Sequence, residues 1–203
     1  MRQNLRATLT AASILGLSAA AASPAMAGEG MWTFDNFPAD RMREELGWAP
    51  DQSWLDRVMA GIARVPGCSA SNVSGQGLVL TNHHCVISCV TSLSTSDRNY
   101  IADGFFARAR EEELRCPNMT VDVLMSIANV TSNIETATAG VAPDAFARTR
   151  DAEIARLEQG CSSGTTRCEV VTLYQGGRYA LYQYKRFDDV RLVFAPEHGM
   201  AAF

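Results

Sequence analysis

The spacing of hydrophobic residues predicts helices alternating with strands along most of the chain. Hydrophobic side chains recur at helical spacing over residues 54–65, and Pro66-Gly67 ends this predicted helix. Helical stretches are also expected over residues 105–114 and 143–160, the second bounded by a proline and a glycine. Residues 28–50 combine Trp and Phe with Pro and Gly, and we expect this segment to pack on the core as an arm.

Short runs of β-forming residues predict strands between these helices. Val and Tyr are concentrated in three runs near the end of the chain, separated by turns, and this pattern indicates an antiparallel meander. Two earlier strands are joined by the turn Ser74-Gly75-Gln76-Gly77. The strands are expected over residues 68–73, 78–81, 121–127, 170–174, 179–184 and 190–194.

The first 27 residues have the pattern of a secretory signal peptide. Arg2 and Arg6 form a positively charged start, residues 9–22 are small or apolar, and Ala25-Met26-Ala27 offers a cleavage site. The apolar stretch is too short for a permanent membrane anchor. The pattern favours a signal peptide over an amphipathic first helix of the domain, so we expect the mature protein to begin at Gly28, outside the cytoplasm.

Composition and charge exclude several classes of function. The chain has 203 residues, 20% of them charged, and a formal net charge of −4. It therefore lacks the basic field of a nucleic acid-binding protein and any polybasic lipid-binding cluster. No stretch after residue 27 is long and apolar enough to span a membrane. We predict neither a nucleic acid partner nor a membrane span in the mature chain.

Six cysteines follow the predicted signal peptide, and an oxidising compartment favours their pairing as disulfides. Six cysteines allow about 15 pairings, and the sequence alone does not choose among them. Cys161 and Cys168 bracket a short loop, and we expect them to pair. Cys89 and Cys116 are a second expected pair, which would tie the segment after His84 to the end of the stretch 105–114. The six cysteines are Cys68, Cys85, Cys89, Cys116, Cys161 and Cys168.

The segment Thr81-Asn82-His83-His84-Cys85 carries the candidate chemistry. It ends one predicted strand while Cys68 begins the preceding one, so the hairpin can bring Cys68 and Cys85 within disulfide range. Such a bridge would fix the residue before Cys85. A histidine held in this way suits a general base that takes the proton of a serine hydroxyl and returns it to the leaving amine. His84 is therefore the candidate catalytic residue, and His83, expected on the opposite side of the strand, has a structural role.

A zinc site is the main alternative for this segment. His83, His84, Cys85 and Cys89 fall within seven residues, but their spacing matches none of the common zinc motifs. A strand would also point the two histidines in opposite directions, and the thiols are expected to be bridged. We therefore predict no metal and no cofactor.

Two other patterns are not assigned to catalysis. Residues 160–164 match the Gly-x-Ser-x-Gly pattern of hydrolases, but they follow a predicted helix, whereas the mechanism requires a preceding strand. Ser162 is thus not the nucleophile. The aspartates considered as possible partners of a catalytic histidine have positions typical of turns, helix caps and surfaces. They are Asp97, Asp103, Asp122, Asp188 and Asp189.

The motif around His84 resembles that of chymotrypsin-like proteases, in which the base histidine precedes a cysteine bridged to the strand before it. Over essentially the whole mature chain, longer stretches resemble the bacterial dipeptidyl-peptidases of the 7 and 11 type. These stretches are residues 67–89 (GCSASNVSGQGLVLTNHHCVISC), the segment from Gly104-Phe105 to Cys116-Pro117, residues 173–182 and 189–197, and Glu29-Gly30-Met31-Trp32 at the start.

The resemblance implies a serine exopeptidase that releases dipeptides from peptides with a free N-terminus. The implied location is the periplasm or outer surface of a Gram-negative bacterium, and the implied assembly of the full-length protein is a homodimer. The implied fold is mainly β with helical additions, with residues 28–203 forming the N-terminal half of a chymotrypsin-like double β-barrel. Of the family's triad only the histidine transfers, onto His84, because the Asp and Ser are expected beyond residue 203.

Two hypotheses of different classes follow. The apolar end Ala201-Ala202-Phe203 is unlike the polar end of a finished domain and indicates a truncated sequence. In the first hypothesis the chain is the N-terminal fragment of a serine-type dipeptidyl-peptidase, inactive by itself. In the second it is a catalytically inactive secreted binding or structural protein containing disulfides. A reading frame that continues past codon 203 favours the first, and a stop codon favours the second.

Overall fold

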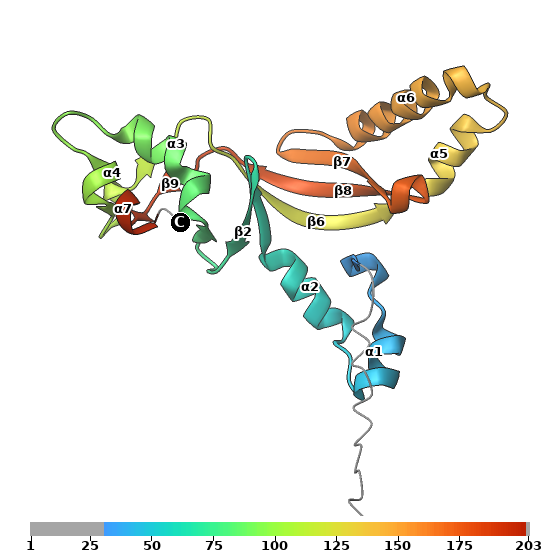
Figure 1. Ribbon diagram of the computed structural model, residues 1–203, viewed down its shortest axis with the longest axis horizontal. Helices are drawn as coiled ribbons and strands as arrows, with labels where there is room; N and C mark the ends of the chain where they lie inside the picture. Colours follow the sequence, from blue (N-terminus) through green and yellow to red (C-terminus); the bar gives the residue numbers. More distant parts are fainter. Residues whose placement is uncertain (1–30, 202–203) are drawn as a thin grey trace, which may run out of the picture. The chain divides into compact units, whose positions relative to one another are not determined.

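The computed structural model describes residues 31–201, which form antiparallel strands and several helices (Figure 1). The chain divides into two units, Met1–Trp32 and Thr33–Phe203, and all elements named below belong to the second. The predicted signal peptide, residues 1–27, lies outside the described residues, as do Ala202 and Phe203.

The described elements follow one another in a mixed order of helices and strands. The helices are η1 (Phe34–Asn36), α1 (Ala39–Leu46), α2 (Gln52–Gly61), α3 (His83–Leu93), α4 (Tyr100–Asp103), η2 (Arg110–Glu112), α5 (Thr131–Thr138), α6 (Pro143–Cys161), η3 (Tyr174–Gly176) and α7 (His198–Ala201). The strands are β1 (Ile62–Val65), β2 (Cys68–Asn72), β3 (Val79–Thr81), β4 (Phe105–Phe106), β5 (Leu114–Arg115), β6 (Val121–Asn129), β7 (Thr166–Leu173), β8 (Arg178–Phe187), β9 (Arg191–Leu192) and β10 (Phe194–Ala195). None of the described helices is long and apolar enough to cross a membrane.

Most strands belong to one six-stranded antiparallel sheet with the order β3-β2-β1-β6-β8-β7. Two further pairs, β4 with β10 and β5 with β9, are separate two-stranded sheets. Since β3 and β7 are free edges, the sheet does not close into a barrel within residues 31–201. The fold is mixed helix and antiparallel sheet, with more helix than the expected mainly β architecture.

The predicted helix over residues 54–65 is correct only in its first part. The Asp51 carboxylate accepts the backbone N–H of Trp54 at 2.7 Å and caps α2 at its start. The helix then ends at Gly61, and residues 62–65 form β1, in which Ala63 and Val65 are buried. This strand pairs with β2 across Pro66-Gly67, so alternating burial overrides the helical spacing in the last turn.

The predicted helix over residues 105–114 is wrong. Gly104 ends the short helix α4 with φ +70° and ψ −179°, and the chain continues as β4, η2 and β5. These two short strands pair with β10 and β9 near the end of the chain. Partners some eighty residues away in the sequence decide this conformation, and local spacing does not reveal them.

The predicted C-terminal meander has two correct strands and one misplaced strand. β7 and β8 form the expected hairpin, but the second neighbour of β8 is β6. Residues 190–194 split instead between β9 and β10, which leave the six-stranded sheet. In Figure 1, β6, β7 and β8 run side by side, with α5 and α6 beside them.

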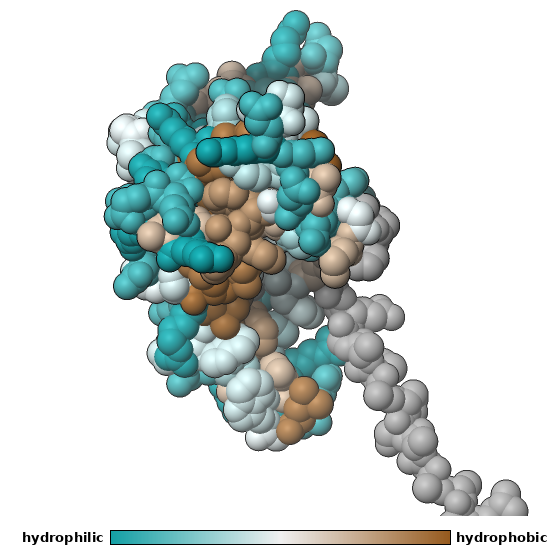
Figure 2. Space-filling model, turned by 90° about the vertical axis from the view of Figure 1, so that its left-hand side faces the viewer, coloured by the Kyte–Doolittle hydropathy of each residue, from teal (hydrophilic) through white to brown (hydrophobic). Residues whose placement is uncertain are grey.

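Two hydrophobic clusters hold these elements together. The larger joins α3 to the start of β6 and to β1 and β2, and the smaller lies where α5 and α6 pack on β7 and β8. Figure 2 shows a further gathering of apolar side chains on the face where α4 and α7 lie in Figure 1. The rings of Phe106 and Phe194 are also exposed, and their centroids lie 6.3 Å apart across the β4–β10 pair.

Candidate active site

His84 lies in the first turn of α3, directly after the edge strand β3. Asn82 has an extended backbone, and the helix begins at His83. The helix then buries Cys85, Cys89 and Val90 against the core, at the spacing of one helical face. His84 lies outside this face and is exposed. The imidazole is thus accessible from solvent while its backbone is fixed by the buried side of the helix.

The expectation that His83 and His84 lie on opposite sides of a strand is wrong. Both residues belong to the first turn of α3, because burial at positions 85, 89 and 90 has helical rather than alternating spacing. The Nε2 atom of His83 is buried and has no hydrogen-bond partner among the described residues. Its ring lies 5.5 Å, centroid to centroid, from that of His198 in α7. Nothing in the sequence indicated this contact, because His198 is far from His83 along the chain and belongs to no motif.

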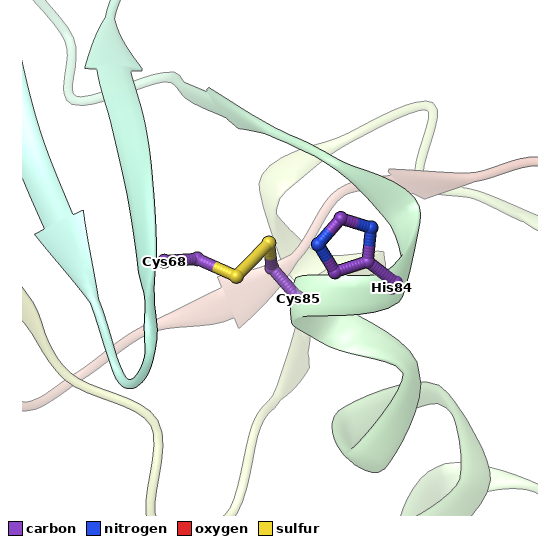
Figure 3. Close-up of side chains that lie close together, drawn as sticks. All are labelled: Cys68, His84 and Cys85. Carbon is purple, nitrogen blue, oxygen red and sulfur yellow. A yellow bond between two sulfur atoms is a disulfide. The ribbon is translucent and has the colours of Figure 1, made fainter.

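The predicted disulfide between Cys68 and Cys85 is present beside His84 (Figure 3). It joins the first residue of β2 to the first turn of α3, with 6.0 Å between the two Cα atoms. The hydroxyl of Thr81 also donates to the carbonyl of Ser69 at 2.9 Å, which ties β3 to β2 just before the helix. Two independent links therefore hold the backbone on either side of His84.

Cys68, Cys85 and His84 form a cluster of potential ligand atoms. The two sulfurs and a ring nitrogen all lie within 4.8 Å of one another. Figure 3 shows the imidazole turned toward the disulfide. While the sulfurs are bonded to each other they are not thiolates, and the thiolate is the form that binds metals. In this oxidised form the cluster is a restraint on His84 and not a cation site.

The other two predicted disulfides are also present. Cys89 and Cys116 join the middle of α3 to the segment before β6, and both are buried. Cys161 and Cys168 join the end of α6 to β7. No cysteine in the described part of the chain is free. The bonds of Cys85 and Cys89 connect α3 to the chain both before and after it, so the helix that carries His84 is fixed at two points.

The residues that the sequence assigned to structural roles make structural contacts. Asp122 accepts both hydrogen bonds of a bidentate pair with Arg186 at 2.7 Å. Ser162 follows α6, as expected, and its hydroxyl oxygen accepts the backbone N–H of Cys168 at 3.1 Å. Within residues 31–201, no carboxylate or serine hydroxyl is hydrogen-bonded to His84. In the described chain, His84 therefore has neither the carboxylate nor the serine partner of a triad.

A network around Arg64 was not predicted. The Arg64 guanidinium donates to Glu169 at 2.7 Å and to the Tyr184 hydroxyl at 3.0 Å, and it lies over the Tyr184 ring. The Glu169 carboxylate raises the pKa of Arg64 above its ordinary value. Arg64 in β1 lies more than one hundred positions before Glu169 in β7 and Tyr184 in β8, so only the pairing of the strands in the sheet brings it to them.

Two hollows in the described chain lie away from His84. One of about 380 Å³ is bounded by α5 and α6, and one of about 220 Å³ lies between η1, α2 and β6. His84 lines neither of them. The His84 imidazole lies on an open surface. Neither hollow could therefore enclose a substrate next to it.

The chain as a whole, beyond the segment around His84, matches a known family. The family model of peptidase S46 matches residues 27–203. The chain belongs to the peptidase S46 family. This confirms the predicted family resemblance.

Curated S46 relatives of two kinds are similar to this chain. A dipeptidyl-peptidase 7 of Porphyromonas gingivalis is 35% identical over the whole chain, which covers 30% of that protein. An Asp/Glu-specific dipeptidyl-peptidase of Flavobacterium psychrophilum is 32% identical over 68% of this chain and 20% of its own length. The chain thus spans less than a third of these S46 proteins.

Solved structures of an S46 relative share the fold. The crystal structure of Porphyromonas endodontalis DPP11 in complex with substrate superimposes with a TM-score of 0.69 at 27% identity. The match covers 86% of this chain and 28% of that one. The complex of the same protein with the dipeptide Arg-Asp gives a TM-score of 0.71.

Proposed function

We propose that this chain supplies the general base of a serine-type dipeptidyl-peptidase, and that the base is His84. The observation that supports this role most directly is the exposed imidazole in the first turn of α3, beside the Cys68–Cys85 disulfide. A base must hold its ring at hydrogen-bonding distance from the hydroxyl that it deprotonates. The disulfide and the β2–β3 pairing reduce the motion of the backbone that carries the ring.

The chemical role proposed for His84 is a proton transfer in two directions. The neutral imidazole takes the proton of the serine hydroxyl as that oxygen attacks the peptide carbonyl. The resulting imidazolium then donates the proton to the amine of the leaving peptide, which frees the acyl-enzyme for attack by water. The substrate is a peptide with a free N-terminus, and the product of each cycle is a dipeptide.

The residues that complete the triad are proposed to lie in a part of the protein beyond residue 203. The chain covers 30% or less of the relatives described above. The proposal therefore takes residues 28–203 as the N-terminal part of a longer peptidase, in which Asp and Ser approach His84 from the remaining chain. This part by itself is expected to release no dipeptide.

The closed chymotrypsin-like barrel is likewise proposed to need strands from the remaining part of the protein. The described sheet has the free edge strand β3 immediately before His84, and apolar side chains are exposed on β4 and β10. Free edges and exposed apolar faces are ordinarily covered in a finished fold. We propose that later strands of the peptidase pair with β3 and complete a barrel there.

Location and assembly are also part of the proposal. The S46 match begins at residue 27, where the predicted signal peptide ends, and the disulfides suit an oxidising compartment. Both observations support export to the periplasm or outer surface of a Gram-negative bacterium. The full-length peptidase is proposed to be a homodimer, which light scattering after size-exclusion chromatography measures directly.

The test is a His84→Ala substitution in the peptidase expressed from the reading frame past codon 203. Release of dipeptide from a fluorogenic dipeptide substrate is expected to fall by at least about 10²–10⁴-fold, the usual contribution of a general base. Because His84 is exposed and makes no hydrogen bond in residues 31–201, the thermal unfolding temperature should change little.

The matched control is His198→Ala, which removes an exposed imidazole outside the proposed proton path. This variant should retain most of the activity. Normal turnover by His84→Ala would remove this residue from the mechanism. A stop codon directly after codon 203 would refute the longer peptidase and favour the inactive secreted protein.

A further inference from the structure

The cluster at the start of α3 combines two sulfurs and an imidazole in a way that the peptidase role does not use. Cys68, Cys85 and His84 place their potential ligand atoms within 4.8 Å of one another. Within the part of the chain that the structure describes, this is the one such group of three. Cys68 is partly exposed and His84 is exposed, so solvent and small solutes reach the cluster.

Once the disulfide is open, these atoms are near enough to take the spacing of a tetrahedral zinc site. With Zn–S near 2.3 Å and Zn–N near 2.0–2.1 Å, neighbouring ligand atoms lie about 3.6–3.8 Å apart. The two sulfurs, about 2 Å apart in any disulfide, would each have to move by roughly 1 Å after reduction to reach this separation. The ring nitrogen, which lies within 4.8 Å of both sulfurs, would have to approach them by about 1 Å. Two thiolates, one imidazole and one water form a donor set that open zinc sites use.

The backbone around the cluster does not depend on the disulfide alone. The β2–β3 pairing places Ala70 opposite Thr81, and the Thr81 hydroxyl donates to Ser69. The buried Cys89–Cys116 disulfide anchors α3 from its other side. Opening the Cys68–Cys85 bond therefore leaves the three side chains next to one another.

We propose that reduction of the Cys68–Cys85 disulfide converts this cluster into a binding site for Zn²⁺ or a similar thiophilic divalent cation, with His84 as its nitrogen ligand. A dithiol reductant supplies two electrons and two protons, so that its own thiols become a disulfide while Cys68 and Cys85 become thiols. The cation then displaces one proton from each thiol. The lone pair of His84 provides the third protein ligand, and water fills the fourth position.

Occupation of this site has a consequence for the proposed peptidase. A ring nitrogen of His84 that is bound to a cation cannot accept a proton from serine, so the reduced, metal-loaded form is inactive. This consequence rests on the proposed function, whereas the metal site itself does not. A test by metal spectroscopy therefore separates the two.

The experiment reduces the purified chain with a phosphine without denaturant, so that the buried Cys89–Cys116 bond is protected. It then removes the reductant without oxygen and titrates with Co²⁺. We expect one equivalent to bind, with the charge-transfer absorption of thiolate ligands and the visible absorption of tetrahedral cobalt, and Zn²⁺ to displace it. The oxidised chain should show neither signal. Cys68→Ser and His84→Ala should each weaken binding by at least about tenfold, since even a residue outside the ligand shell is worth that much.

The matched control is the double variant Cys161→Ser and Cys168→Ser, which removes a disulfide remote in sequence from the cluster and should keep the Co²⁺ signal. Unchanged binding in His84→Ala or in Cys68→Ser would overturn the proposal, as would the absence of thiolate absorption in the reduced chain. Circular dichroism follows the helices throughout. A reduced chain that loses its helices would also overturn it, because the cluster would no longer be held together.

Discussion

Replacing Gly104 by alanine should destabilise this fold more than any other Gly→Ala change that we consider. Gly104 has φ +70° and ψ −179°, a backbone conformation that is open essentially only to glycine. A Cβ atom at this position would lie 2.9 Å from the carbonyl oxygen of Ala195 and 3.2 Å from the backbone nitrogen of Glu197. These neighbours are backbone atoms, so no side chain can rotate away.

The magnitude has two contributions. The backbone conformation alone costs about 1–3 kcal/mol for a residue with a side chain. The contact with Ala195 adds to this, because β10 pairs with β4 at the adjacent residue Phe105 and cannot move without losing that pairing. We expect a loss of about 3 kcal/mol or more in the free energy of unfolding, a large part of the 5–15 kcal/mol or so that stabilises a typical domain.

The assay is urea unfolding of the oxidised chain followed by circular dichroism, with Gly140→Ala as the matched control. Gly140 has the same φ of +70°, but a Cβ there would meet no atom within 4 Å. Its substitution should cost only the left-handed backbone conformation, about 1–2 kcal/mol. Equal losses in the two variants would refute the close approach at Gly104, and a loss below that of Gly140→Ala would refute the whole argument.

Two further predictions concern the disulfides and the start of α2. Replacing Cys89 and Cys116 together by alanine should lower the free energy of unfolding, measured in urea, by about 3.5 kcal/mol, against about 2.3 kcal/mol for the pair Cys161 and Cys168. The difference arises because the first disulfide closes a longer loop, with a sequence separation of 27 residues against 7. A larger loss for the second pair would contradict the loop-entropy argument. The Asp51 carboxylate accepts a backbone N–H of the first turn, which holds its pKa below the ordinary value. Its stabilising effect is therefore full above the ordinary pKa and is lost as the pH falls through the lowered one. Carboxyl NMR titration should find this lowered midpoint, and Asp51→Ala should remove the part of the pH dependence of stability that comes from this carboxylate.

Local sequence patterns were sufficient where an element is decided by its own residues. The long helix α6 begins at Pro143 as predicted, and the β2–β3 hairpin and the β7–β8 hairpin follow their turns. The patterns were insufficient where a distant strand decides. Residues 62–65 continue a helical spacing but pair with β2 and β6, and residues 114–115 pair with β9. Such pairings have no local signal, because the partner lies far along the chain.

The candidate site was predictable to the extent that it depends on covalent chemistry. The sequence alone did not choose among the possible pairings of the cysteines, but the short spacing favoured Cys161–Cys168, and the predicted hairpin allowed the Cys68–Cys85 bond that restrains His84; both bonds are present. The orientation of His83 was not predictable, because a strand and a helix each accommodate the sequence His-His-Cys, and only the burial of Cys89 and Val90 selects the helix. The contact between His83 and His198 required the position of α7.

The helix at this position also links the two proposals for His84. In a strand, neighbouring side chains point to opposite faces, so a disulfide at Cys85 would lie on the other side of the sheet from the imidazole. In the first turn of a helix, residues 84 and 85 both project near the strand β2, and the sulfurs lie next to the ring. The geometry that restrains the imidazole by a sulfur bridge therefore also gives the reduced sulfurs access to the same ring nitrogen, and the redox state of one bond decides which role His84 has.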